Sequence, residues 1–253
     1  MDQPAAGALM RLTVLGSSGT YPSPGRPASG YLIEQQGTRV WCDAGPGTMV
    51  SLPVDLELID AVMVSHRHPD HCLDVITASH ALAYCPRPRY GVPLYGPESA
   101  LKCLVGFVDG GRIEDVFDVR PLVDGDRATI GALTLEVAET DHSVPTLASR
   151  WETEARSLCF SADTGPAGDW MRLARDVHLF LCEATYQGEP GLHPYPHHLT
   201  AGESGAIARQ AGAKRLMLTH IPPYLDPARS VTEAEAAFDR PVALAVPGAS
   251  TTL

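Results

Sequence analysis

The chain has 253 residues, of which 44% are hydrophobic and 19% charged, and its net charge at pH 7 is −11. No apolar run approaches the roughly 20 residues needed to span a bilayer, which disfavours an integral membrane protein. Only two lysines are present and the arginines are dispersed, so the clustered basic patch of a nucleic-acid-binding protein is not seen. A small anionic substrate held by metal ions is compatible with this charge.

Two further features concern cellular location. The first residues contain no basic segment followed by an apolar one, so we expect no signal peptide. The six cysteines are scattered and form no CxxC pair, which is typical of free thiols in a reducing compartment. We therefore expect a cytoplasmic protein.

The first third of the chain predicts strands joined by turns. Short β-prone runs predict strands over residues 11–15, 31–35, 38–43 and 61–65. Gln36-Gly37 is a plausible hairpin turn, and residues 16–30 are rich in glycine and proline, which predicts a long loop. After the fourth strand, Pro69 is expected to keep the chain from continuing as helix. A helix is predicted over residues 73–84.

The second half alternates between strand and helix. Strands are predicted over residues 117–122, 128–140, 157–162, 177–184, 216–219 and 242–246, with a turn at Asp124-Gly125. Helices are predicted over residues 201–211 and 231–238, and Thr200 with Glu203 has the spacing of a capping box. Strands in both halves with helices between them predict two packed sheets with helices outside. We expect residues 1–253 to form one domain.

The segment HRHPDH places His66, His68, Asp70 and His71 within six residues. Neutral imidazole and carboxylate groups are the ligands that borderline divalent cations prefer. A solvated loop that is rich in histidine by accident is the alternative, and a chance HxHxDH has odds of roughly one in a thousand. The spacing therefore favours a metal site.

Three further candidate ligands, His142, Asp163 and His220, each follow a predicted strand, where loops carry active-site residues. Taken singly, each histidine would more often be a surface or core residue, and Asp163 would more often be a helix cap before Pro166. Their order and their common position at strand ends, together with HRHPDH, favour one shared site.

This order of motifs resembles the metallo-β-lactamase superfamily, and the resemblance covers essentially the whole chain. It implies a four-layer αββα sandwich with two divalent metal ions, of which zinc is favoured and manganese or iron are open. By this resemblance, His66, His68 and His142 hold one metal, while Asp70, His71 and His220 hold the other. Asp163 would bridge the two.

Further motifs resemble the ribonuclease Z-like phosphodiesterase branch of that superfamily. These are the bridging aspartate in place of a cysteine, the stretch DAGPGT at residues 43–48, CEAT at residues 182–185, and HLT at residues 198–200. The resemblance implies that His198 protonates the leaving oxygen with Glu183 as its partner, and it also counts Asp70 among the catalytic residues. His80, His178, His193 and His197 are interpreted as spectators.

Only 20 residues lie between His142 and Asp163, which leaves no room for the long arm that grips transfer RNA in ribonuclease Z. The segments PASGYL, FDV, LFLCEA and LTHIPP are most similar to the atypical class II cyclic nucleotide phosphodiesterases of actinobacterial type. The expected substrate is therefore a small anionic phosphodiester, with 3′,5′-cyclic AMP as lead, and a homodimer is suggested. The alternatives are a ribonuclease Z-like RNA 3′-end endonuclease, a lactonase or thioester hydrolase, and a non-catalytic metal-binding module.

Overall fold

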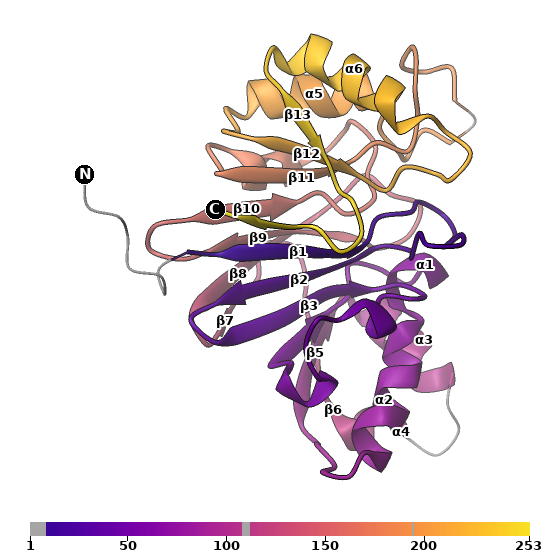
Figure 1. The fold of residues 1–253 in the computed structure, drawn as a ribbon, viewed down its shortest axis with the longest axis vertical. Helices are drawn as coiled ribbons and strands as arrows, with labels where there is room; N and C mark the ends of the chain where they lie inside the picture. Colours follow the sequence, from indigo (N-terminus) through magenta and orange to yellow (C-terminus); the bar gives the residue numbers. More distant parts are fainter. Residues whose placement is uncertain (1–8, 108–111, 194) are drawn as a thin grey trace.

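The computed structural model describes residues 9–107, 112–193 and 195–253, which form two seven-stranded sheets (Figure 1). The strands of the first sheet are β1 (Arg11–Gly16), β2 (Gly30–Gln35), β3 (Thr38–Ala44), β4 (Ala61–Met63), β5 (Val92–Gly96), β6 (Phe117–Pro121) and β14 (Ser250–Thr252). Their spatial order is β14–β1–β2–β3–β4–β5–β6.

The second sheet is built from the later part of the chain. Its strands are β7 (Arg127–Ile130), β8 (Leu133–Glu139), β9 (Leu147–Glu152), β10 (Ser157–Phe160), β11 (Leu179–Glu183), β12 (Leu216–Thr219) and β13 (Val242–Leu244), in the spatial order β13–β12–β11–β10–β9–β8–β7. In this sheet β10 to β13 pair in parallel, and in the first sheet β3 to β6 do so. Parallel strands bring their carboxyl ends to one edge, where loops can assemble a site.

Helices cover the outer face of each sheet. The first sheet is covered by α1 (Pro69–Cys72), α2 (Asp74–Tyr84), α3 (Glu98–Phe107) and α4 (Arg112–Val116), with the short 3₁₀ turns η1 (Met49–Ser51) and η2 (Leu56–Leu58). The second is covered by η3 (Asp169–Ala174), α5 (Ala201–Gln210) and α6 (Pro227–Phe238). Figure 1 shows these two helical layers on opposite sides of the paired sheets. The expected αββα sandwich is confirmed.

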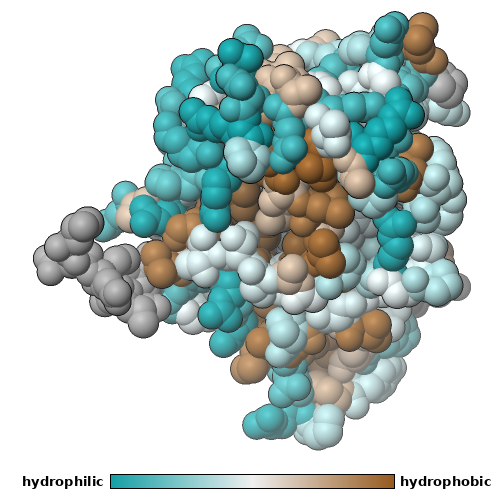
Figure 2. All heavy atoms as spheres, turned by 45° about the horizontal axis from the view of Figure 1, so that its top comes forward, coloured by the Kyte–Doolittle hydropathy of each residue, from teal (hydrophilic) through white to brown (hydrophobic). Residues whose placement is uncertain are grey.

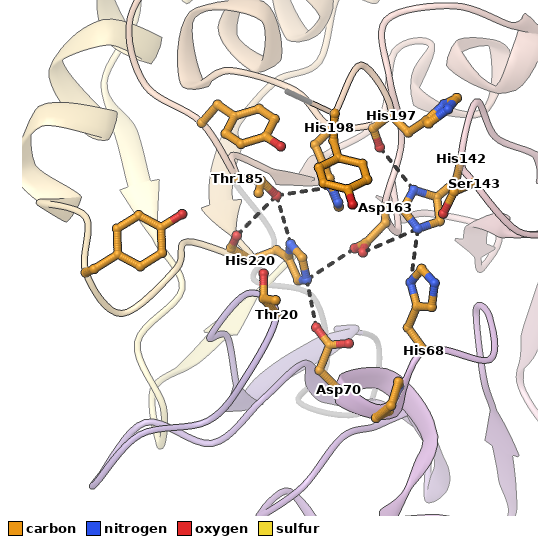
Figure 3. Close-up of a pocket in the computed structure, with 14 residues that line it drawn as sticks. Thr20, His68, Asp70, His142, Ser143, Asp163, Thr185, His197, His198 and His220 are labelled. Atoms are coloured by element: carbon orange, nitrogen blue, oxygen red, sulfur yellow. Dashed lines mark hydrogen bonds and ion pairs between the residues drawn. The ribbon is translucent and has the colours of Figure 1, made fainter. Parts of the chain in front are cut away.

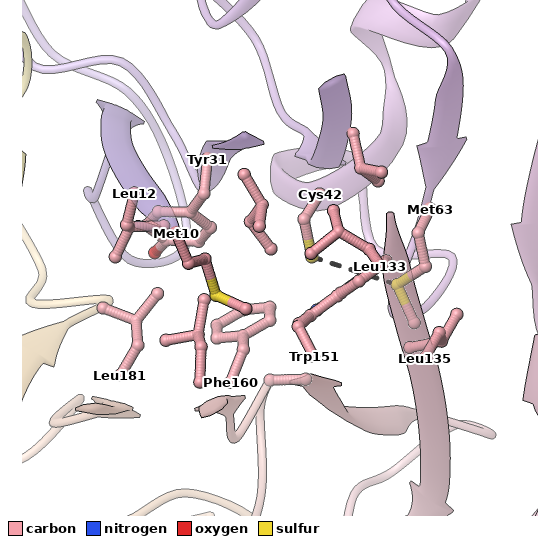
Figure 4. Packing of buried hydrophobic residues seen from close by; sticks show 14 of the residues in the cluster. Met10, Leu12, Tyr31, Cys42, Met63, Leu133, Leu135, Trp151, Phe160 and Leu181 are labelled. Carbon is pink, nitrogen blue, oxygen red and sulfur yellow. Dashed lines mark hydrogen bonds between the residues drawn. The ribbon is translucent and has the colours of Figure 1, made fainter. Parts of the chain in front are cut away.

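One apolar core joins the facing sides of the two sheets (Figure 4). Tyr31 of the first sheet packs against Phe160 of the second, with ring centroids 5.1 Å apart, and Trp151 is fully buried nearby. Burial of a phenylalanine such as Phe160 contributes about 1.5–3 kcal/mol. This shared core supports a single domain over residues 1–253, which stays a prediction.

The expectation for Pro69 is wrong. Pro69 is the first residue of the short helix α1, which carries Asp70 and His71. Proline is well suited to the first helical position because its missing N–H would have no partner inside the helix and its fixed φ is helical. The proline therefore starts a helix here instead of preventing one.

Other boundaries also differ from those expected. The predicted strand over residues 128–140 is a hairpin, β7 and β8, because Gly131 turns the chain with a φ of +53°. The predicted helix over residues 231–238 begins at Pro227, one turn earlier, where Asp226 caps it by accepting a hydrogen bond from the N–H of Ala228. The elements β5, α3, α4, β9 and β14 were not predicted.

The remaining expectations about the chain concern membranes and its first residues. Among the described residues, no helix has both the length and the apolar character needed to cross a bilayer. Figure 2, which brings the α5–α6 side forward, shows mostly hydrophilic residues there and a group of hydrophobic ones in the middle of the view. The expected lack of a signal peptide concerns a segment that includes residues 1–8, which lie outside the described residues.

Candidate metal centre

The seven predicted ligands converge at the ends of four strands. Figure 3 shows the five of them that line the pocket, which are His68, Asp70, His142, Asp163 and His220. His66, His68, Asp70 and His71 follow β4, His142 follows β8, Asp163 follows β10 and His220 follows β12. They form two groups with Asp163 between them. We call His66, His68 and His142 the first cluster, and Asp70, His71 and His220 the second cluster.

In the first cluster three ring nitrogens face one another. Nδ1 of His68 lies 3.0 Å from Nε2 of His66 and 3.2 Å from Nε2 of His142. Oδ2 of Asp163 lies 3.6 Å from the His66 nitrogen and 3.9 Å from the His142 nitrogen. Together they form a compact set of three nitrogen atoms and one oxygen atom.

In the second cluster the Nε2 atoms of His71 and His220 lie 3.2 Å apart. Oδ2 of Asp70 is 3.2 Å from the His220 nitrogen and 3.5 Å from the His71 nitrogen. The other oxygen of Asp163, Oδ1, is 3.4 Å and 3.3 Å from the same two nitrogens. Each oxygen of Asp163 thus faces a different cluster.

Hydrogen bonds outside the clusters fix which nitrogen of each ring carries a proton. Nδ1 of His71 donates to the Asp43 carboxylate at 2.6 Å, and Nδ1 of His142 donates to the main-chain carbonyl of His197 at 3.0 Å. When these rings are neutral, their inward Nε2 atoms therefore carry lone pairs.

Two hydroxyl groups fix the other two rings in the same way. The Ser65 hydroxyl donates its one proton to Asp43 at 3.0 Å, so Nδ1 of His66 must donate to that hydroxyl. The Thr185 hydroxyl donates to Glu183 at 2.5 Å, so Nδ1 of His220, 2.9 Å away, must donate to Thr185. Both rings are left with an inward lone pair on Nε2.

Lone pairs that face each other at about 3 Å need a proton or a cation between them. Oδ1 of Asp163 is likewise buried and has no hydrogen-bond partner among the described residues. The donor set of imidazole nitrogens and carboxylate oxygens suits zinc, manganese or iron. The residues present therefore fit the two divalent cations that the fold implies.

The electrostatics differ between the two clusters. Burial lowers the pKa of His66 well below its ordinary value, and it also lowers the pKa values of His68 and His142, so these rings are neutral at pH 7. Burial also acts to lower the pKa of His71, but the charges of Asp163, Asp70 and Asp43 outweigh it and raise that pKa well above its ordinary value. The second cluster is thus an environment that stabilises positive charge.

His198 and Glu183 form a pair beside both clusters, in which Glu183 is buried and His198 is partly buried. Nδ1 of His198 donates to the Glu183 carboxylate at 3.0 Å, and Glu183 also accepts hydrogen bonds from the main-chain N–H and the hydroxyl of Thr185. Burial acts to lower the pKa of His198, but the charge and hydrogen bond of Glu183 raise it to about 9. The His198 ring lies near one ligand of each cluster, 5.1 Å from the His142 ring and 5.7 Å from the His220 ring.

The other histidines have different surroundings. His80 stacks on Tyr84 within α2, and His178 lies immediately before β11, where its Nδ1 contacts Ser157. His193 stacks on Tyr186. His197 lines the pocket, and besides its carbonyl contact with His142 its Nδ1 lies 3.3 Å from Asp141, two contacts that the sequence did not predict.

Sequence reasoning assigned no role to Asp43, Ser65 or Thr185, although Asp43 and Thr185 lie in the quoted motifs. The signal was the position of Asp43 at the end of a buried strand, immediately before a glycine-rich turn. Asp43, Ala162 and His220 all have positive φ values, of 56°, 51° and 55°, so the backbone is strained where β3, β10 and β12 reach the centre. Gly45 is also required, because a Cβ there would lie 2.0 Å from the carbonyl oxygen of Asp70.

A pocket of about 660 Å³ opens onto the centre and is lined by His68, Asp70, His142, Asp163, His198 and His220, among others. This volume lies within the range of roughly 300–1,000 Å³ that is usual for small-molecule sites. Among the residues that the structure describes, no lysine or arginine lines it. An anion bound there would have to be neutralised by metal ions or by His198.

Comparisons with known proteins agree with this architecture. A family model described as a beta-lactamase superfamily domain matches residues 38–221. An uncharacterized protein of Mycobacterium tuberculosis is 38% identical over 242 residues, covering 92% of this chain and 88% of the relative. A ribonuclease Z of Kineococcus radiotolerans is 30% identical over 277 residues, covering 89% and 88%. The crystal structure of the metallo-beta-lactamase fold protein YhfI from Bacillus subtilis has a TM-score of 0.88 at 24% identity, covering 97% of this chain and 100% of that chain.

Proposed function

The chain belongs to the β-lactamase superfamily and is a metal-dependent hydrolase, and from this premise we propose that it is a phosphodiesterase for small substrates, with 3′,5′-cyclic AMP as the lead candidate. The observation that carries the proposal is the ring of inward nitrogen lone pairs around the two oxygens of Asp163. Such a centre would suit two divalent cations that bind one phosphodiester better than it suits any packing role.

The proposed ligands follow the two clusters. His66, His68 and His142 with Oδ2 of Asp163 would hold one cation, and Asp70, His71 and His220 with Oδ1 of Asp163 would hold the other. When bound, the two cations would act as Lewis acids on the phosphoryl group and provide a nucleophile at neutral pH. Zinc is the proposed metal, with manganese and iron as alternatives, because the ligands are nitrogen and oxygen atoms alone.

His198 is the proposed proton donor to the leaving oxygen. Its Nδ1 is held by Glu183, so Nε2 is the atom that gives up a proton, and its raised pKa keeps that proton in place at pH 7. Glu183 positions the ring. Asp70 is proposed to act with these two as well as being a ligand, because its carboxylate lines the pocket.

The chain between His142 and Asp163 favours a small substrate over transfer RNA. These residues form β9 and β10, which are joined by a tight turn in which the N–H of Thr153 donates to the carbonyl of Arg156. No arm protrudes from this described segment, and no lysine or arginine is among the described residues that line the pocket. Both features support a substrate that enters the pocket whole.

The test is a substrate panel on the purified protein loaded with manganese or zinc. We expect turnover of bis-p-nitrophenyl phosphate and of 3′,5′-cyclic AMP, and no cleavage of a transfer-RNA precursor or an acyl lactone. Asp163→Asn, which keeps the size of the side chain, serves as the inactive control, and His80→Ala on α2 serves as the matched active control. Turnover of the lactone with neither phosphodiester touched would contradict the proposal, and cleavage of the precursor alone would favour an RNA endonuclease.

Location and assembly are part of the proposal. The six free thiols support a reducing compartment such as the cytoplasm. A homodimer is proposed on the family resemblance, and the mass of the purified protein by light scattering would test it.

A further inference from the structure

Three tyrosines line the pocket beside the metal centre and have no role in the proposed chemistry. They are Tyr186, Tyr195 and Tyr224. Tyr195 and Tyr224 are 66% and 70% exposed, although they line the same pocket as the candidate metal ligands. Exposed aromatic rings at a pocket mouth are characteristic of binding sites.

Tyr186 connects this aromatic surface to the proposed proton donor. Its main chain is fixed by hydrogen bonds with Leu199 and Ala201 on either side of Thr200. One face of its ring is covered by His193, at 4.1 Å between centroids and nearly parallel, and the ring meets His198 edge-on at 5.9 Å. The ring of Tyr186 is therefore held in one position next to His198.

Tyr224 lines the same pocket as His220 of the second cluster, and its backbone is held by a turn. It lies four residues after His220, in a turn in which the N–H of Leu225 donates to the carbonyl of Pro222. The Arg26 side chain donates to the carbonyl of Pro223 at 3.2 Å and fastens this turn to the loop before β2. The ring of Tyr224 is thus presented from an anchored backbone.

The charge of the pocket restricts what these rings can bind. Sites for single-stranded nucleic acid combine stacking rings with a positively charged groove that follows the backbone. Here the rings occur without a lysine or arginine among the described lining residues. One planar group next to one phosphodiester matches these features, and a polynucleotide does not.

We infer that Tyr195 and Tyr224 form a subsite that stacks against the planar aromatic group, a nucleobase, of a mononucleotide-sized phosphodiester held at the metal centre. This inference rests on the proposed function and extends it to the part of the substrate that is not hydrolysed. Stacking of one base on an aromatic side chain is worth roughly 1–3 kcal/mol, so loss of one ring reduces the affinity about 5- to 150-fold.

The test compares two substrates that differ only in the base: 3′,5′-cyclic AMP and the abasic cyclic phosphate of the same sugar. We expect the wild type to prefer the nucleotide by its KM, and Tyr195→Leu and Tyr224→Leu each to reduce that preference about tenfold. Tyr195→Phe and Tyr224→Phe should keep it, because a phenyl ring still stacks. Tyr90→Leu, at an exposed tyrosine that does not line the pocket, is the matched control.

A second readout does not require turnover. Calorimetric titration should show adenosine 5′-monophosphate binding more tightly than ribose 5-phosphate to the wild type, and this difference should shrink in the leucine variants. An unchanged preference in the leucine variants, in both assays, would overturn the subsite while leaving hydrolysis intact. If neither cyclic phosphate is hydrolysed, the proposed function fails, and the titration decides the subsite by itself.

Discussion

The two halves of the metal centre resemble each other in ligand number and differ in charge. The first cluster consists of three imidazoles that burial keeps neutral, and the shared Asp163 is its one carboxylate. The second cluster has Asp70 in addition, with Asp43 directly behind His71, and it raises the pKa of His71. A cation is attracted more strongly to the second cluster, so one motif in the sequence, HRHPDH, contributes to two unequal sites.

The substitution with the largest expected effect is Asp163→Asn, which removes the negative charge that both clusters share. We expect both cations to be lost. Activity should fall by more than about 100-fold, because substitution of a residue that only supports a ligand typically costs about 10- to 100-fold. Metal content measured by mass spectrometry and rates with cyclic AMP check this. Two tightly bound cations in the variant would show that the clusters do not depend on Asp163.

His198→Ala tests whether His198, which lies beside both clusters, is a proton donor or a further ligand, since its ring could join Asp163 and His220 around a metal. A proton donor predicts about a hundredfold loss of rate with both cations retained. The pKa of His198 is about 9, and bound cations should lower it. In the wild type the rate should therefore fall as the pH rises through this pKa. In the variant this alkaline fall in rate should be absent. Loss of one cation would identify His198 as a ligand instead.

Asp43→Asn tests the second cluster alone. The amide keeps the shape of the side chain but removes the charge behind His71, so we expect the affinity of the second site to fall about 10- to 100-fold. The first site should be weakened less, because Asp43 reaches His66 only through the Ser65 hydroxyl. Competition with a metal-binding dye measures the two affinities. Asp118→Asn, at an exposed ion pair with Arg120, is the matched control. An equal loss of metal affinity at both sites would show that the charge of Asp43 does not favour the second site.

Lowering the pH should also produce a difference in metal affinity between the two clusters, smaller than the effects of the substitutions above. A raised pKa means that protons compete with a cation for His71 already near neutral pH, whereas the lowered pKa values of His66, His68 and His142 delay such competition. As pH falls from 8 to 5, the second site should therefore lose affinity first, by up to about tenfold per pH unit. Metal content at stepwise lower pH measures this, and an unchanged content at pH 4.5 would contradict an imidazole-built centre.

Much of this centre could be predicted because its residues are chemically unusual. Residue type and order were enough to identify HRHPDH and the strand-end residues His142, Asp163 and His220 as candidates. The structure brings all of them together. Alternating and apolar runs likewise predicted most of the strands that carry them. The ligand roles themselves stay predictions until a metal is measured.

What could not be predicted depends on contacts between distant segments. Asp43 becomes a partner of His71 only when β3 and β4 lie side by side, and Thr185 meets His220 only when β11 and β12 pair. The strand β9 was missed because LASRWE is too polar to signal a buried strand, and β5 because VPLYG contains proline and glycine. The pocket tyrosines lie outside the regular elements, where periodicity carries no information.

The left-handed backbone at Asp43, Ala162 and His220 has a consequence for evolution in the laboratory. Each such position costs on the order of 1–3 kcal/mol, which the rest of the fold must offset. Selection for heat resistance alone would therefore favour glycine or asparagine at these points, since those residues adopt the conformation more readily. A variant selected only for stability at high temperature should therefore lose activity, because the geometry of the site changes. A thermostable and active form is better obtained by changing residues away from these strand ends.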